Sequence, residues 1–116
     1  MRILVCGDRN WKNMESIEKI LINYSSNTTI IHGCANGADT LAGLIGQNLK
    51  MSVERYPAQW NIYGRAAGPI RNRKMIEEGR PDLVYAFHSD IEKSKGTKNM
   101  INQATSEHIP VILITK

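Results

Sequence analysis

The sequence lacks the features that mark membrane, metal-binding and disulfide-stabilised proteins. It has two cysteines and three histidines in 116 residues, and no apolar run approaches the roughly 20 residues that a membrane helix needs. Cys6 and Cys34 form neither a Cys-x-x-Cys pair nor a disulfide framework, and the scattered histidines do not complete a structural zinc site. The apolar run at residues 1–6 is too short for a signal peptide. We therefore expect reduced thiols, no metal, no membrane association and a cytoplasmic location.

Two common nucleotide-binding fingerprints are also absent. The chain contains neither the Gly-x-Gly-x-x-Gly turn of dinucleotide-binding domains nor the Gly-x4-Gly-Lys-Ser/Thr loop of P-loop proteins. We predict no bound cofactor, and any nucleotide must be held by a different set of loops.

What is present is typical of one ordinary folded domain. Hydrophobic residues make up 41% of the chain and charged residues 22%, with no low-complexity tract, so residues 1–116 are predicted to form a single domain. The formal net charge of +4 favours anionic ligands without choosing among nucleotides, nucleic acid and acidic proteins.

The hydrophobic pattern predicts alternating strands and helices. Short apolar runs indicate strands at residues 3–6, 29–31, 51–56, 83–87 and 111–114, and apolar positions at helical spacing indicate helices at 14–24, 38–50, 69–78 and 97–107. This order predicts an α/β fold: a Rossmann-like three-layer sandwich with a five-stranded parallel sheet and helices on both faces. Ligands of such folds bind beyond the carboxyl ends of the strands.

Two glycine-containing loops follow the first two predicted strands. After the first strand, Gly7 suits a tight turn, and Asp8 or Asn10 suits a helix cap better than a ligand contact when taken alone. After the second strand, residues 32–39 contain two glycines, whose backbone N–H groups at a helix start favour an anion. The alternative is that the glycines only turn the chain, that Asp39 only complements the helix dipole, and that His32 is a structural hydrogen-bonding residue.

The segment 60–74 combines aromatic rings, glycines and cations. Trp60 suits stacking on a base or ribose, while Arg65 and Arg71 offer planar donors that match phosphate. A helix beginning near Pro69 puts Arg71 in its first turn, where a cation opposes the helix dipole unless an anion compensates it. The alternative is a solvated basic surface.

A final loop leads to the last predicted helix. Gly96 and Thr97 suit a helix start that meets an anion, whereas Lys93 and Lys95 are expected to be solvated.

Together these segments resemble the YspA-like branch of the SLOG superfamily, found in bacteria and phages. The residues 7–9 are similar to its Gly-Ser-Arg turn, residues 32–39 match its HGxxxGAD signature, and residues 63–72 match its YGRAAGPxRN segment. The resemblance implies a Rossmann-like domain that binds nucleotides or nucleotide-derived molecules, and some members are proposed to sense or process defence signals. Distant relatives include DprA-like DNA-binding proteins.

Other relatives, the lonely-guy phosphoribohydrolases, carry a GGxGTxxE loop whose glutamate takes part in cleaving an N-glycosidic bond. Here residues 93–100 align with that loop, and Met100 stands in place of the glutamate. Catalysis by that route is therefore not expected, although Asp39 or Asp8 could serve in an enzyme with a different mechanism.

We therefore expect a module that senses or sequesters a phosphate-bearing nucleotide-like ligand. One alternative function is hydrolysis of a nucleotide. A second, less favoured, is binding of single-stranded nucleic acid. A homo-oligomer that completes the pockets is also expected. The predicted ligand-binding residues are Gly7, Asp8, Arg9, His32, Gly33, Gly37, Ala38, Asp39, Trp60, Arg65, Gly68, Arg71, Asn72, Gly96 and Thr97.

Overall fold

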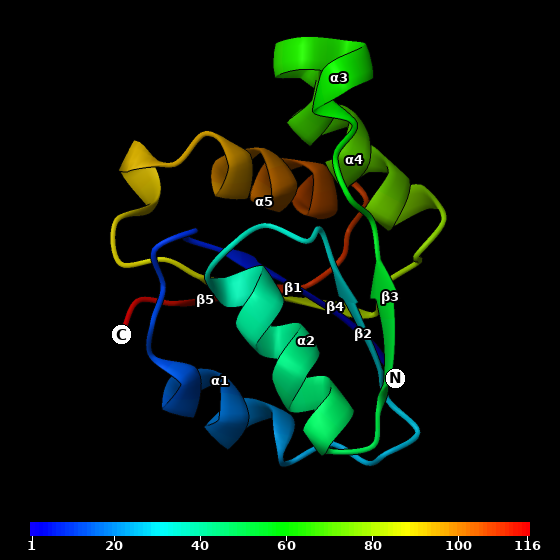
Figure 1. Ribbon diagram of the computed structural model, residues 1–116, viewed down its shortest axis with the longest axis vertical. Coiled ribbons are helices and arrows are strands. Elements are labelled where there is room, and N and C mark those ends of the chain that lie inside the picture. Colours follow the sequence, from blue (N-terminus) through cyan, green and yellow to red (C-terminus); the bar gives the residue numbers. More distant parts are fainter.

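A computed structural model describes all 116 residues and places five parallel strands in one sheet (Figure 1). The strand order is β3-β2-β1-β4-β5. The bounds are β1 Arg2–Gly7, β2 Thr29–His32, β3 Ser52–Arg55, β4 Leu83–Phe87 and β5 Val111–Ile114. The parallel sheet and the Rossmann-like arrangement predicted from the sequence are confirmed.

Helices cover both faces of the sheet. α1 and α2 lie on one face, and α4 and α5 lie on the other (Figure 1). The short helix α3 and two 3-10 turns, η1 and η2, complete the fold. The bounds are α1 Met14–Leu21, α2 Ala38–Asn48, α3 Trp60–Tyr63, η1 Gly64–Ala66, α4 Ala67–Glu77, η2 Ile91–Lys93 and α5 Gly96–Ser106.

Alternation along the strands fills two hydrophobic cores. On β1, Ile3 and Val5 pack with α1 and α2, whereas Leu4 and Cys6 pack against α4 and α5. Each fully buried aliphatic side chain contributes roughly 1.5–3 kcal/mol to folding. A central strand that is apolar on both sides holds the two layers together, which fixes the loops at its carboxyl end.

The strand order reverses between β1 and β4. The chain passes outward from β1 to β2 and β3, then returns to β4 on the opposite side of β1. The helix after β1 lies on one face and the helix after β4 lies on the other, so their loops diverge and leave a crevice between them.

Several local predictions are corrected by the structure. α4 begins at Ala67, so Arg71 lies in the second turn and opposes the helix dipole less than predicted. Asn13, rather than Asp8 or Asn10, caps α1, because its side chain accepts from the Ser16 N–H at 3.2 Å. Differences at other element ends are small: α1 stops at residue 21, α2 at residue 48, and β3 is limited to residues 52–55.

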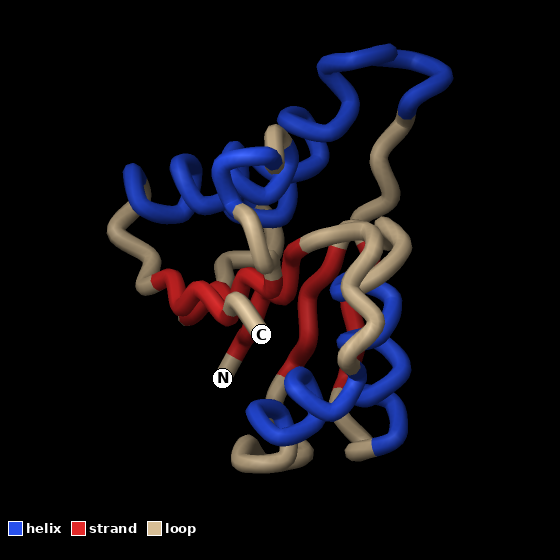
Figure 2. Tube along the Cα trace, turned by 90° about the vertical axis from the view of Figure 1, so that its left-hand side faces the viewer, coloured by secondary structure: helices blue, strands red, loops and turns tan.

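The helix α3 was not predicted and projects from the body of the molecule (Figure 1). Figure 2 shows the same segment, connected to β3 by an extended loop, clear of the sheet. None of its residues is buried, and the side chains of Trp60 and Ile62 are 56% and 67% exposed. We call residues 57–66 the arm. No helix of the fold has the length and apolarity required to cross a membrane.

Candidate ligand-binding site

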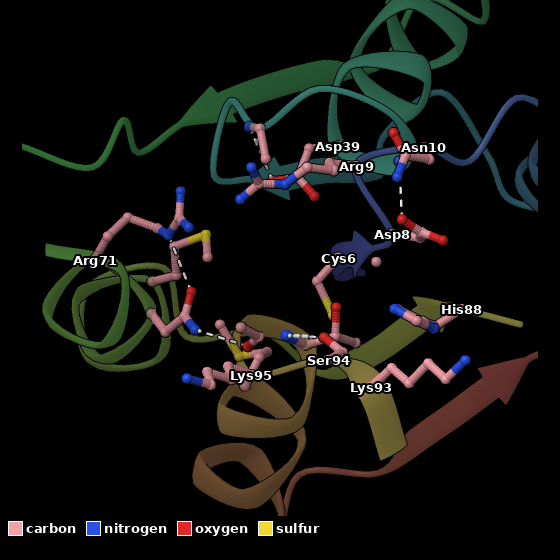
Figure 3. Close-up of a pocket in the computed structure, with 17 residues that line it drawn as sticks. Cys6, Asp8, Arg9, Asn10, Asp39, Arg71, His88, Lys93, Ser94 and Lys95 are labelled. Atoms are coloured by element: carbon pink, nitrogen blue, oxygen red, sulfur yellow. Dashed lines mark hydrogen bonds between the residues drawn. The ribbon is translucent and has the colours of Figure 1, made fainter. Parts of the chain in front are cut away.

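A hollow of about 360 Å³ opens at the carboxyl ends of β1 and β4, where the strand order reverses (Figure 3). We call it the inner hollow. Its walls come from the loop after β1, the start of α2, the helix α4, and the segment from β4 to α5. The lining residues are Cys6, Gly7, Asp8, Arg9, Asn10, Ala35, Asp39, Arg71, Asn72, Met75, His88, Lys93, Ser94, Lys95, Gly96, Thr97 and Met100.

The loop after β1 is fixed by backbone hydrogen bonds to neighbouring segments. The Asp8 N–H donates to the Phe87 carbonyl at 2.8 Å, and the Asp8 carbonyl accepts from the Trp11 and Ala38 N–H groups at 3.1 and 3.2 Å. One carboxylate oxygen of Asp8, Oδ1, accepts from the Asn10 N–H at 2.9 Å. The other oxygen has no protein donor, so it is available to a ligand in the inner hollow.

Asp39 orders the loop after β2 from inside the protein. Its side chain is 4% exposed, and Oδ2 accepts from the N–H groups of Gly33 at 2.8 Å and Ala35 at 3.4 Å. Burial raises the pKa of Asp39 to about 6, against the opposing effects of the Gly33 hydrogen bond and the nearby Arg71 guanidinium. The carboxylate is thus mainly ionised at neutral pH, and it is committed to loop structure.

Arg71 is anchored through two of the three nitrogens of its guanidinium. Nε donates to the Asn72 amide oxygen at 3.0 Å and Nη1 donates to the Gly33 carbonyl, while Nη2 donates to no protein atom. None of the four ion pairs in the structure includes Arg71. A side chain at Gly33 would overlap the guanidinium, which explains why glycine suits that position. The arginine is therefore held in place with donors left for a ligand.

The start of α5 forms the opposite wall. The buried Asn72 amide donates to the Gly96 carbonyl at 3.3 Å and to the Asn99 side chain at 3.1 Å, which ties α4 to this helix. The Thr97 N–H donates to Ser94 Oγ at 3.0 Å, and Gly96 has open space above its Cα. Lys95 precedes the helix and its own side chain does not cap it, so a cation lies beside the backbone donors that Ser94 leaves free.

A second hollow of about 590 Å³ adjoins the first, and we call it the outer hollow. It lies between the loop after β2 and the arm. Trp60, Arg65 and Gly68 line it, with the Trp60 ring adjacent to the Cα of Gly68. The two hollows share Arg9, Ala35, Arg71, Lys95 and Gly96.

Most of the predicted site residues meet at these two hollows. Twelve of the fifteen line one or both: Gly7, Asp8, Arg9, Gly33, Asp39, Trp60, Arg65, Gly68, Arg71, Asn72, Gly96 and Thr97. The predicted convergence of loops at the carboxyl ends of the strands is therefore present in the structure.

Three predicted residues, His32, Gly37 and Ala38, line neither hollow. His32 is buried, and its Nδ1 accepts from the Cys34 N–H at 3.0 Å, as a structural histidine would. Burial, together with Arg55 and Arg71, lowers the pKa of His32 to about 4, so the ring is neutral at physiological pH.

Gly37 and Ala38 support the site from behind. Gly37 has a φ of 78°, and a side chain there would overlap the Asp8 carbonyl. Together with the hydrogen bond from the Ala38 N–H, this close approach fixes the loop after β1 against the start of α2. Their role is to position Asp8 and Arg9.

The sequence analysis missed several polar residues of the inner hollow. Asn10, His88, Lys93, Ser94 and Lys95 all line it, although the two lysines were expected to be solvated. Their side chains are indeed exposed, yet they border the opening. The available signal was the position of these residues after a strand, Asn10 after β1 and the other four after β4, because the loops at that end of a parallel sheet converge.

Solved structures share this fold. DNA processing protein A from Streptococcus pneumoniae aligns with a TM-score of 0.79 and 18% identity over 97% of this chain, and the chain spans about half of that protein, 49%. UDP-GlcNAc 2-epimerase from Neisseria meningitidis, bound to UDP-GlcNAc, aligns with a TM-score of 0.54 and 17% identity over 98% of this chain and 32% of that one. At these identities the likeness concerns the fold alone.

A sequence relative comes from a phage. The Gene 61 protein of Mycobacterium phage D29 is 30% identical over 120 residues, which cover 96% of this chain and 94% of the relative. Residues 1–63, more than half of the chain, match the YspA, cpYpsA-related SLOG family. As the glycine and arginine motifs predicted, the chain belongs to that family.

Proposed function

We propose that the protein binds a phosphate-bearing nucleotide or nucleotide-derived molecule in the joined hollows and acts as a sensor or sequestering protein. The observation that carries the proposal is the cluster of Arg9, Arg71 and Lys95 on the wall shared by the two hollows. None of these cations belongs to an ion pair. Three unpaired cations next to a helix start favour an anion in the space between them.

Phosphate suits this arrangement better than a carboxylate or a simple anion. Arg71 presents the unpartnered Nη2 edge of a planar guanidinium, and the N-terminal N–H groups of α5 add donors from the opposite wall. A phosphate has enough oxygens to accept from both walls at once. Trp60, with an exposed ring at the outer hollow, would then stack on an attached base.

Two proteins that share this fold support the proposal at the level of the fold alone. One is a DNA processing protein, and the other is an enzyme whose structure contains the nucleotide sugar UDP-GlcNAc. In such folds ligands bind beyond the carboxyl ends of the strands, which is where the two hollows lie.

The direct test is to identify what the purified protein holds. Mass spectrometry of small molecules released by denaturation should detect a phosphate-containing nucleoside derivative, and calorimetry should then give its affinity for the stripped protein. Saturable binding of one class of nucleotide is the expected result. Absence of binding to mono-, di-, cyclic and sugar-linked nucleotides at millimolar concentration would contradict the proposal.

A nucleotide hydrolase is the enzymatic alternative. Asp39 would have to give up two backbone hydrogen bonds to act on a substrate, and fully buried Met100 supplies no carboxylate at the start of α5. Asp8 retains one free oxygen and is the stronger candidate of the two. Chromatography of nucleotides incubated with the protein should show no turnover. Steady product formation that Asp8→Ala or Asp39→Ala abolishes would replace binding with catalysis.

A second candidate function is binding of single-stranded nucleic acid, which the arm favours. Trp60, Ile62 and Tyr63 are exposed there beside Arg65, a combination of aromatic rings and cation that suits unpaired bases. Oligonucleotide binding would weaken steeply as salt rises because counterions are released, whereas a compact nucleotide should show a shallower dependence. Titration of a fluorescent oligonucleotide at several salt concentrations separates the two functions.

The homo-oligomer remains a prediction, and the arm is its proposed contact. The large apolar residues Trp60, Ile62 and Tyr63 of the arm, together with Ile70 on the adjoining helix α4, are at least 41% exposed. A second copy that covers them would also close the outer hollow. Light scattering coupled to gel filtration should give a mass above the 13.0 kDa of one chain. Ile62→Lys should lower the measured mass to that of one chain.

A further inference from the structure

The inner and outer hollows differ in chemistry on either side of their shared wall. The wall is cationic because Arg9, Arg71 and Lys95 all lie on it. Figure 3 shows Arg71 and Lys95 toward one end of the inner hollow, and Asp8, His88 and Lys93 toward the other. An anionic ligand group should therefore rest at the wall, between the two spaces.

The far part of the inner hollow is not suited to a phosphate. The carboxylate of Asp8 lies there with a single lysine, Lys93, whose amine already lies 3.6 Å from the Asp90 carboxylate. A negatively charged group placed there would meet repulsion from Asp8 and little compensating attraction.

The same part of the inner hollow is suited to neutral hydroxyl groups. Asp8 keeps one oxygen free as an acceptor. His88 Nδ1 accepts from the Asp90 N–H at 3.0 Å, so Nε2 carries a hydrogen and can donate. Acceptors and donors placed close together are what a sugar with several hydroxyls requires.

The outer hollow is suited to a flat ring. It is lined by Trp60, Pro57, Ala58 and Pro69, and it has no carboxylate. Both hollows have the volume typical of small-ligand pockets, about 300–1,000 Å³. A mononucleotide with its phosphate on the shared wall would fill one of the two and leave the other to water.

We infer, on the basis of the nucleotide binding proposed above, that the ligand is a nucleoside diphosphate joined to a second sugar. The diphosphate lies along the shared cationic wall, the second sugar occupies the inner hollow near Asp8 and His88, and the base occupies the outer hollow against Trp60. The ligand class is thus that of nucleotide sugars, with either a purine or a pyrimidine base.

Matched pairs of ligands test this inference by calorimetry. ADP-ribose is compared with ADP, and UDP-GlcNAc with UDP. In each pair the second sugar replaces one ionisable oxygen of the terminal phosphate, so the sugar-bearing ligand carries less negative charge and any tighter binding must come from the sugar. In at least one pair the sugar-bearing ligand should bind about tenfold or more tightly, as expected for two added hydrogen bonds. Equal or weaker binding of both sugar-bearing ligands would overturn the inference and leave the proposed nucleotide binding intact. Absence of binding by all four would overturn both.

Variants then locate the second sugar. Asp8→Asn preserves the acceptor for the Asn10 N–H but replaces the free oxygen, so it should bring the affinity ratio of the pair to about one while the diphosphate binds as before. Glu15→Gln, on the first turn of α1, is the control for an equal change of charge and should keep the ratio. His88→Gln is a second variant for the same subsite. Trp60→Ala should weaken both ligands and keep their ratio. An unchanged ratio in both Asp8→Asn and His88→Gln would show that the sugar does not lie in the inner hollow.

Discussion

Replacement of Arg71 by alanine is the sharpest test of the anion site. The change removes the Nη2 donor on the shared wall together with the positive charge. It does not alter the packing of α4, because Arg71 is not among the buried residues of this helix. A hydrogen bond between charged partners contributes about 1.5–3 kcal/mol, which corresponds to roughly 10-fold to 150-fold weaker binding. The Gly33 carbonyl and Asn72 side chain also lose a donor, but both lie at the hollow, where water can replace it. The buried Asp39 carboxyl also loses a neighbouring cation, so the cost in folding free energy should be about 1–2 kcal/mol.

Calorimetric titration of the tightest ligand into the wild type, Arg71→Ala, Arg71→Lys and Arg73→Ala provides the measurement. Arg73 lies on the same helix, but its side chain is 71% exposed and paired with Glu77, so its removal should leave affinity unchanged. Lysine preserves the charge without the planar donor edge and should give an intermediate affinity. If Arg71→Ala binds as tightly as the wild type, Arg71 is a surface cation and the proposed phosphate site is wrong.

Three further predictions concern Asp39, the glycines and Trp60. The pKa of Asp39 is raised from its ordinary 3.8 to about 6, so its contribution to stability is present below about pH 4 and is lost as pH rises through 6. Relative to Asp39→Asn, the wild type should gain up to about 3 kcal/mol in urea unfolding between pH 7.5 and pH 4; a difference that is flat with pH would contradict this. Gly37→Ala should cost about 1–3 kcal/mol, because φ is positive and the Asp8 carbonyl blocks a side chain, whereas Gly96→Ala, in open space, should change stability by less than about 1 kcal/mol. A ligand in the outer hollow should quench the fluorescence of exposed Trp60 but not of buried Trp11, so Trp60→Phe should abolish the quenching, and its persistence would place the ligand elsewhere.

The sequence was most informative where a strand is a continuous apolar run. The predicted strands 83–87 and 111–114 coincide with β4 and β5, and in both cases a proline lies shortly before the run and marks its start. β4 is almost wholly buried, whereas β5 is a half-exposed strand at the edge of the sheet. The four-residue helix α3 was beyond prediction, since helical periodicity does not appear in so short a segment. The cap of α1 was wrong for another reason. The sequence analysis considered Asp8 and Asn10 and did not consider Asn13, which directly precedes the helix. The tertiary hydrogen bond from the Asp8 N–H to the Phe87 carbonyl holds Asp8 away from the helix.

The candidate site was predictable as a meeting of loops, but not as a division of roles among them. Gly33 and Gly37 lie four residues apart in the same motif, yet Gly33 makes room for the Arg71 guanidinium and Gly37 makes room for the Asp8 carbonyl. The sequence pattern around the two glycines does not distinguish their roles. The roles differ because the tertiary fold places a different group against each glycine. The same holds for His32, whose ring turns toward the Cys34 N–H rather than the hollow.

Binding should be coupled to uptake of a proton at Asp39. The Arg71 charge helps to keep this buried carboxyl ionised, and a diphosphate held by Arg71 would neutralise that charge and add negative charge close by. Both effects raise the pKa of Asp39 above 6 in the complex, so a fraction of a proton is taken up near pH 6.5 and affinity rises as pH falls. ADP-ribose suits the measurement because its diphosphate, substituted at both ends, does not itself titrate in this range. Calorimetry in buffers of different ionisation enthalpy should show proton uptake by the wild type and none by Asp39→Asn. Identical binding enthalpies in all buffers for the wild type would mean that the phosphate does not compete with Asp39 for Arg71, and that the anion lies elsewhere on the shared wall.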